Sequence, residues 1–176
     1  MFTFDPAEGS SAELPESARV RDLKRRIDFE AAVASERADE HVAVQVEHFA
    51  APAPVASWQQ RRGVDTLSQG EVLVNMRFTK GEQLVTARFT LFAPAERLRV
   101  ARSLIDRADA VTTVEIGDLR GPRDLGTLSL AHEAGGTVYW IYRNVYAEVI
   151  VHRTPIDKFA VARDMQAQFE AALRRR

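Results

Sequence analysis

The sequence predicts an α+β fold, with a single antiparallel or mixed sheet of about six to seven strands and two or three amphipathic helices packed on one face. Three observations predict it: an aromatic and β-branched stretch at 137–152, a glycine-centred hairpin signal at 71–92, and helical periodicity after residue 154. Strands joined by short turns pair antiparallel, and amphipathic helices need a face to cover.

The composition is that of an ordinary globular chain. The 176 residues are 45% hydrophobic and 28% charged, enough to bury a core without disulfides. We expect residues 1–16, rich in Ser, Glu, Pro and Gly, to form a flexible or edge-attached segment, and residues 17–176 to form one α+β domain. The formal net charge of −1 gives no global field to attract nucleic acid.

Several functional classes are excluded by residue type. The absence of cysteine rules out disulfides, thiolate catalysis and cysteine-ligated metal. No segment approaches the ~20 apolar residues that a membrane span needs, and the N-terminus does not have the pattern of a signal peptide. A cytoplasmic protein is the expectation, and an exported one is the alternative if a signal peptide has been removed.

The first half of the chain predicts a helix, a strand and a hairpin. Ser17 is the N-cap of a helix, and alternation over 41–50 predicts a strand. The Ala-Pro-Ala-Pro run at 51–54 ends regular structure, a helical turn is expected at 58–63, and 64–70 is expected to be loop. Two strands then flank a turn in which Gly81 supplies a positive φ.

The second half begins with a helix opened by Pro94, whose apolar stripe is Leu98, Ala101, Leu104, Ile105 and Ala108. Strands are predicted at 111–116 and 127–132, with a loop at 117–126 between them and a Gly-Gly turn after them. A final helix is expected with Thr154 as N-cap, Pro155 at its first position and Asp157 in a capping box. Its apolar side would hold Ile156, Phe159, Ala162, Met165, Phe169 and Leu173.

The stretch at 137–152 is read as two strands that break at Arg143 and Asn144, because Asn tolerates the left-handed backbone conformation of a tight turn. One long strand through Asn144 is the competing interpretation. The aromatic rings of residues 137–152 cannot all face inward if the side chains of each strand alternate between its two faces. Tyr, Trp and Arg are also enriched at binding hot spots. The candidate binding residues are therefore Tyr139, Trp140, Tyr142, Arg143, Asn144 and Tyr146. The alternative is that a helix covers one face and the other rings form cross-strand pairs that stabilise the sheet.

Signals for chemistry are weak. The histidines at 41, 48, 132 and 152 have no metal-ligand spacing, so no metal site is expected. Glu148 and His152 lie on one strand face about 13 Å apart, too far for direct contact. Arg120 and Arg123, in a loop flanked by two aspartates, are candidates for anion binding, and a solvated turn is the alternative. No phosphate-binding, serine-hydrolase or RNA-recognition motif is present.

These patterns favour a non-enzymatic protein-binding or adaptor module that uses the aromatic sheet surface or edge at 139–146. The expected partner is another protein or a second copy of the chain, with no cofactor and no nucleic acid. A small-molecule-binding protein or hydrolase-like enzyme, with its site between sheet and helices, is the alternative. A weaker hypothesis assigns an anionic partner to the arginines at 174–176, whose other interpretation is complementation of the helix dipole.

Overall fold

The structure is a computed structural model that describes residues 44–67, 70–96, 99–101, 103–104, 125–126, 128–131 and 135–174. The predictions for the segment 1–16, the helix after Ser17, the strand 111–116 and the anion-binding candidates Arg120 and Arg123 lie outside these residues. His41, His132 and the last two arginines do so as well.

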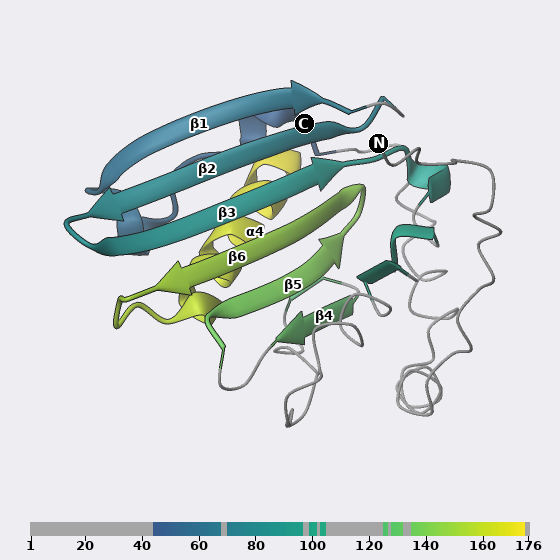
Figure 1. Cartoon of the computed structure of the whole chain (residues 1–176). Coiled ribbons are helices and arrows are strands. Elements are labelled where there is room, and N and C mark those ends of the chain that lie inside the picture. The colour runs from purple at the N-terminus through teal and green to yellow at the C-terminus, as the bar shows by residue number, and fades with distance from the viewer. Residues whose placement is uncertain are drawn as a thin grey trace, which may run out of the picture.

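One antiparallel sheet of six strands forms the body of the described chain, in the order β1-β2-β3-β6-β5-β4 (Figure 1). Its strands are β1 (Gln59–Thr66), β2 (Val72–Lys80), β3 (Gln83–Leu91), β4 (Leu128–Ala131), β5 (Thr137–Tyr142) and β6 (Val145–His152). Strands β1 to β3 form one meander and β4 to β6 another, and the two meet where β3 pairs with β6. The prediction of a single antiparallel sheet is confirmed.

Both predicted hairpins form. In the β2–β3 hairpin, Lys80 pairs with Gln83, and Gly81 adopts the expected positive φ of 58°. In the β5–β6 hairpin, Tyr142 pairs with Val145, which confirms two strands rather than one. The left-handed residue of that turn is Arg143, with φ of 52°, so the reason given for the break was wrong in assigning this conformation to Asn144.

Helix α4 (Lys158–Arg174) begins later than the sequence predicted. Asp157 is its N-cap, because its Oδ1 accepts a hydrogen bond from the amide of Phe159 at 2.9 Å. The Thr154 hydroxyl instead accepts from the amide of Ile156 at 3.2 Å, in a turn that precedes the helix. Pro155 therefore lies outside the helix, and the capping box predicted from Thr154 is absent.

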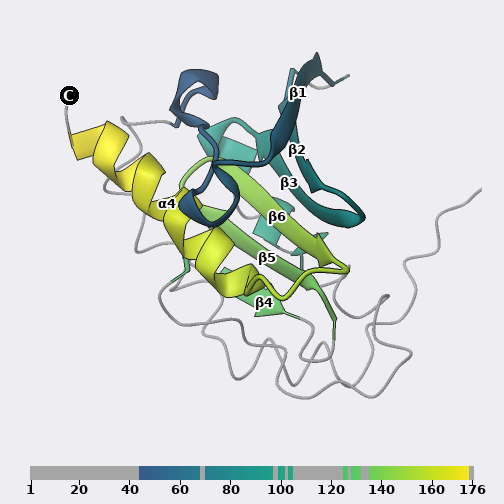
Figure 2. The ribbon, with the colours of Figure 1, turned by 90° about the vertical axis from the view of Figure 1, so that its left-hand side faces the viewer.

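The main core lies between α4 and one face of the sheet (Figure 2). The rings of Phe49, Phe89 and Phe169 meet at its centre, with centroids 4.5 to 5.6 Å apart. Ala162, Met165 and Phe169 are fully buried as predicted, and the same face of the strands supplies Val74, Met76, Phe78, Val85, Ala87, Val138, Trp140, Ala147 and Val149. The predicted number of helices stays untested beyond α4.

The helix expected from Pro94 starts with a 3-10 turn, Pro94–Glu96, and residues 99–101 and 103–104 are helical. Ala101 and Leu104, two members of the predicted apolar stripe, are buried. The strand expected at 127–132 is present as β4.

Two predictions for the first half are wrong. Residues 44–50 form no strand: they contain the 3-10 turn Val46–His48, and Val44 and Phe49 are buried as separate anchors. Residues 59–66, expected as a helical turn and a loop, form the strand β1, which pairs with β2 over its whole length. A second 3-10 turn, Ala53–Val55, lies between these segments.

The sheet face opposite α4 is covered unevenly. Leu130, Tyr139 and Ile141, on β4 and β5, are buried there. Arg77 on β2 and Arg88 on β3 lie on the same face and are exposed. The β1–β3 half of this face is therefore less covered than the β4–β5 half, and we call it the open face.

Candidate functional site

The aromatic residues predicted as a binding surface are divided between the two faces. Trp140 is fully buried in the main core, where its ring meets Phe89 edge to face at 6.5 Å. Tyr139 and Tyr146 lie on the opposite face, stacked at 6.4 Å, and Tyr139 is only 7% exposed. Trp140 therefore has no surface to offer a partner, and Tyr139 has little.

Tyr142 and Arg143 lie together at the β5–β6 turn. Arg143 donates from Nε to the Tyr142 hydroxyl at 3.3 Å, and its guanidinium carbon is 5.7 Å from the centroid of that ring. The ring also stacks on Phe169 of α4 at 6.5 Å. This pair is half-buried, so it retains some exposed surface.

Asn144, the other turn residue, is 6% exposed, and its side chain points inward, toward Val44. Its Oδ1 accepts the amide of Val44 at 2.8 Å, and its Nδ2 donates to the carbonyl of Val44 at 3.1 Å. The amide side chain thus pairs with the N–H and C=O of Val44 in the way that a residue of a neighbouring strand would. Asn144 therefore fastens the segment before β1 to the hairpin.

Glu148 and His152 do not form a pair. Glu148 is buried, and its Oε2 lies 3.5 Å from Nη1 of Arg88, directly opposite it on β3. His152 is exposed and lies opposite Leu84. The described residues contain no group of three or more metal-binding side chains.

The most exposed regular element described is β1, the first strand of the sheet. All eight of its residues are exposed, and its register with β2 runs unbroken from Gln59 to Thr66. Figure 1 shows it as the outermost strand on its side of the sheet. Among the described residues its outer edge has no strand partner, so it presents a row of backbone donors and acceptors.

Charge on the open face is concentrated near this edge. Arg61 on β1 lies directly opposite Arg77 on β2, a juxtaposition of like charges that destabilises a sheet. Neither guanidinium forms an ion pair with a described residue, and neither does Asp65, two positions along the same face of β1. The edge therefore carries a cation and an anion that the described fold leaves uncompensated.

The other face of β1 is held by Arg62. Its guanidinium donates from Nη2 to the carbonyl of Val46 at 2.7 Å and from Nη1 to that of Phe49 at 3.3 Å. Those bonds connect β1 to the 3-10 turn before it. Val64 lies on the same face of the strand, and it and Leu67 are the large hydrophobic residues that are exposed in the described chain, at 48% and 37%.

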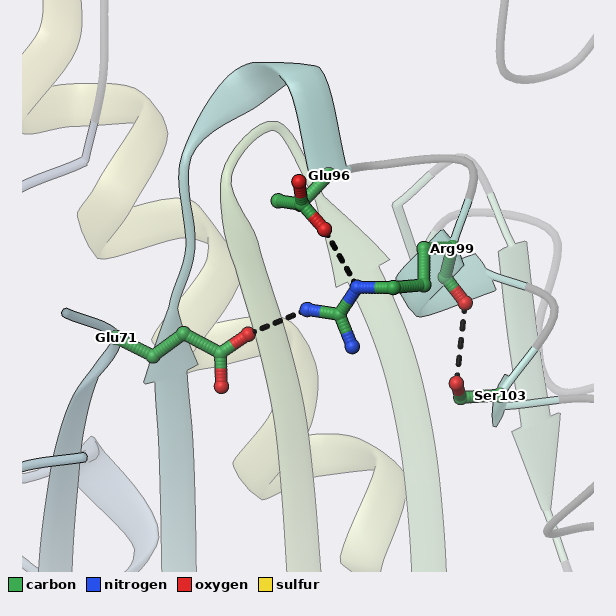
Figure 3. A network of polar contacts seen from close by, with 4 residues as sticks. All are labelled: Glu71, Glu96, Arg99 and Ser103. Atoms are coloured by element: carbon green, nitrogen blue, oxygen red, sulfur yellow. Dashed lines mark hydrogen bonds and ion pairs between the residues drawn. The ribbon is translucent and has the colours of Figure 1, made fainter. Parts of the chain in front are cut away.

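A network around Arg99 lies at the start of β2, beside Val72 (Figure 3). Arg99 donates from Nε to Glu96 at 2.5 Å and from Nη2 to Glu71, the residue before β2, at 2.7 Å. These hydrogen bonds raise the pKa of Arg99 above its ordinary value, and the bond that it donates to Glu96 has the larger effect. The connection between β1 and β2 is also closed by the amide of Leu67, which donates to the carbonyl of Glu71 at 2.7 Å.

Sequence reasoning missed β1 because it has neither an apolar alternation nor a β-branched run. The remaining signal was its position, one short connection before a clear strand, where a hairpin partner is common.

Within the described residues no helix has the length and apolarity to cross a membrane. Compared with family models, curated proteins and solved structures, the chain matches none.

Proposed function

We propose that this chain is a protein-binding module and that its docking element is the outer edge of β1, to which an extended segment of a protein adds as a further strand. The observation that carries the proposal is the full exposure of an eight-residue strand at the edge of the sheet. Strand addition supplies main-chain hydrogen bonds for affinity and alternate side chains for specificity.

The form of the edge supports this use. Natural proteins protect edges by short strands, prolines, bulges or charged side chains. Strand β1 is long, contains no proline and keeps a one-to-one register with β2, so charge is the only one of these devices that it has. Its charges at Arg61 and Asp65 disfavour indiscriminate pairing and select a complementary segment.

The support of β1 by its own chain favours a preorganised edge. The two hydrogen bonds from Arg62 and the eight pairs with β2 hold the strand before a partner arrives. A preorganised edge loses less conformational entropy on binding than a flexible segment would.

The sequence-based location of the surface, at 139–146, is less favoured by these contacts. Strand β5 lies between β4 and β6, so its backbone groups are already shared on both sides. Tyr142 and Arg143 keep half-buried side chains at the hairpin tip and remain candidates for a secondary contact.

Site-specific photocrosslinking in the native host tests the proposal. A p-benzoylphenylalanine in place of Gln60 or Val64 samples the β1 edge, the same group at Tyr142 samples the hairpin tip, and Glu82, in the exposed β2–β3 turn, is the control. We expect a discrete protein adduct from both β1 positions and none from Glu82. Mass spectrometry of the adduct then identifies the crosslinked segment.

Two results would contradict the proposal. Adducts from Tyr142 alone would move docking to the hairpin tip, and β1 adducts no stronger than those from Glu82 would remove the edge as a docking element. Hydrogen exchange gives a second readout, because strand addition protects those β1 amides that point away from β2.

The alternative of a small-molecule or hydrolase-like site gains no support from the described residues. Glu148, its main acidic candidate, is paired with Arg88. A non-enzymatic role is therefore the function that we propose.

A further inference from the structure

We propose that the segment added to β1 is β1 of a second copy of this chain, running antiparallel, with Gly63 opposite Gly63 on the two-fold axis. Two six-stranded sheets would then join into one continuous sheet with α4 of both copies on the same side. This inference rests on the proposed use of β1 as a docking edge and names its partner.

The register follows from the sequence of the strand. With Gly63 on the axis, Arg61 lies opposite Asp65 of the second copy, and Asp65 lies opposite Arg61 of the second copy. Directly opposite residues share a face of an antiparallel sheet, so both pairs form on the open face. Two ion pairs thus arise from Arg61 and Asp65, the two charged side chains of β1 that the described fold leaves without a partner.

The same ion pairs offset the repulsion between like charges within each copy. Arg61 faces Arg77 across the β1–β2 ladder, and the second copy would bring Asp65 to the outer flank of Arg61. The carboxylate then lies beside Arg61, the member of the arginine pair on the edge strand. Assembly therefore relieves a repulsion that the single copy carries.

The opposite face fits this register as well. There Arg62 lies opposite Val64 of the second copy, so the aliphatic part of Arg62 can cover a valine that is 48% exposed in the single copy. A slip by one residue would place Asp65 opposite Arg62, but these two residues lie on opposite faces of β1, so α4 of the second copy would then lie on the other side of the joined sheet. The guanidinium of Arg62 already donates to Val46 and Phe49, which favours the register centred on Gly63.

Gly63 suits the axis position. A Cβ built on it meets no atom within 4 Å, and its φ lies outside the left-handed region, so the single copy has no packing or conformational need for glycine here. Glycine within a strand often marks a place where another backbone approaches closely. In the proposed assembly that backbone is Gly63 of the second copy.

Analytical ultracentrifugation of charge-exchange variants tests the inference. We expect the wild-type chain to dimerise in a concentration-dependent way, and Arg61→Asp or Asp65→Arg to weaken the dimer about tenfold or more, because each places two like-charge pairs at the interface. The double variant Arg61→Asp/Asp65→Arg restores both opposite-charge pairs and should recover dimerisation. Arg153→Asp changes the net charge as Arg61→Asp does, but at an exposed residue after β6, three strands from β1, and should leave the dimer within about twofold.

The outcomes separate this inference from the proposed function. A wild-type chain that stays monomeric at about 100 μM, above the range of most specific complexes, overturns the second copy as partner. If β1 crosslinks to a different protein in the host, the docking function then still stands. A dimer that the double variant fails to recover overturns the proposed register. A dimer that either single β1 variant weakens, that the double variant recovers and that Arg153→Asp leaves unchanged supports both the second copy as partner and the register.

Discussion

Asn144 holds Val44 by two hydrogen bonds although 100 residues of sequence separate them. Both groups of the Val44 backbone and both groups of the amide are used, and all of them are buried. The hairpin turn that the sequence presents as a surface feature is therefore also an attachment point for the segment that leads into β1.

Replacing Asn144 by Ala should lower the free energy of unfolding by about 2–3 kcal/mol, because a buried donor and a buried acceptor of Val44 lose their partner. Urea denaturation followed by circular dichroism measures the change. Asn75→Ala is the matched control, since Asn75 is half-buried on β2 and forms no side-chain hydrogen bond with a described residue. Equal losses from the two variants would show that the attachment to Val44 contributes nothing.

Arg153, directly after β6, is the second described arginine in the left-handed region, with φ of 50°. Its ion pair with Glu82, at 3.8 Å, is between largely exposed side chains and contributes little. Arg153→Gly should therefore stabilise the protein by about 1 kcal/mol, which corresponds to a melting temperature higher by roughly 2–4 °C. Arg153→Ala removes the same charge without relieving the backbone, so a rise of the same size in both variants would argue against the strain.

Gly126 and Gly63 should respond in opposite ways to alanine. A Cβ at Gly126 would lie 2.0 Å from the carbonyl oxygen of Ile141, and its φ is +56°, so Gly126→Ala should cost more than about 3 kcal/mol. At Gly63 a Cβ meets nothing, and Gly63→Ala should leave the stability of the single copy unchanged or raise it by about 0.5–1 kcal/mol. Thermal unfolding at low protein concentration compares the two. A tolerated Gly126→Ala would mean that the bend at residues 125–126 does not need its close approach to β5.

Phe169 should be the most sensitive position of α4. Its ring meets Phe49, Phe89 and Tyr142, and it is fully buried, so Phe169→Ala should cost about 3–5 kcal/mol. Phe159→Ala, at a half-buried position of the same helix, removes the same atoms and should cost less than half as much. Chemical denaturation of both variants checks the ratio. Similar costs would place the centre of the core nearer the start of the helix.

The two hairpins were predictable because local chemistry and tertiary packing agree there. The β2–β3 and β5–β6 strands are rich in β-branched and aromatic residues, and each loop has only two residues between paired strands. Even so, sequence reasoning chose Asn144 as the left-handed residue of the second turn. The amide of Asn144 is engaged by Val44, and Arg143 adopts that conformation instead.

Elements held only by tertiary contacts were not predictable. The residues of β1 are exposed on both faces of the strand, so their sequence shows no alternation of apolar and polar residues. The strand forms because it pairs with β2. Residues 44–50 show the reverse case: they alternate in sequence, but they form a 3-10 turn, and the two buried anchors, Val44 and Phe49, are five positions apart and do not follow the alternation. The ion pair between Glu148 and Arg88 likewise depends on the β3–β6 register, which residue types alone do not reveal.

The sheet's two meanders determine how the chain reaches its folded state. Hairpins within each meander close short loops and form fast, whereas the β3–β6 seam joins residues such as Arg88 and Glu148, which are 60 positions apart. We therefore expect the closing of that seam to be the slow step of folding. Until it closes, the apolar sides of β3 and β6 remain exposed, so the nascent protein is most prone to aggregation in the interval between its second hairpin and the docking of its two halves.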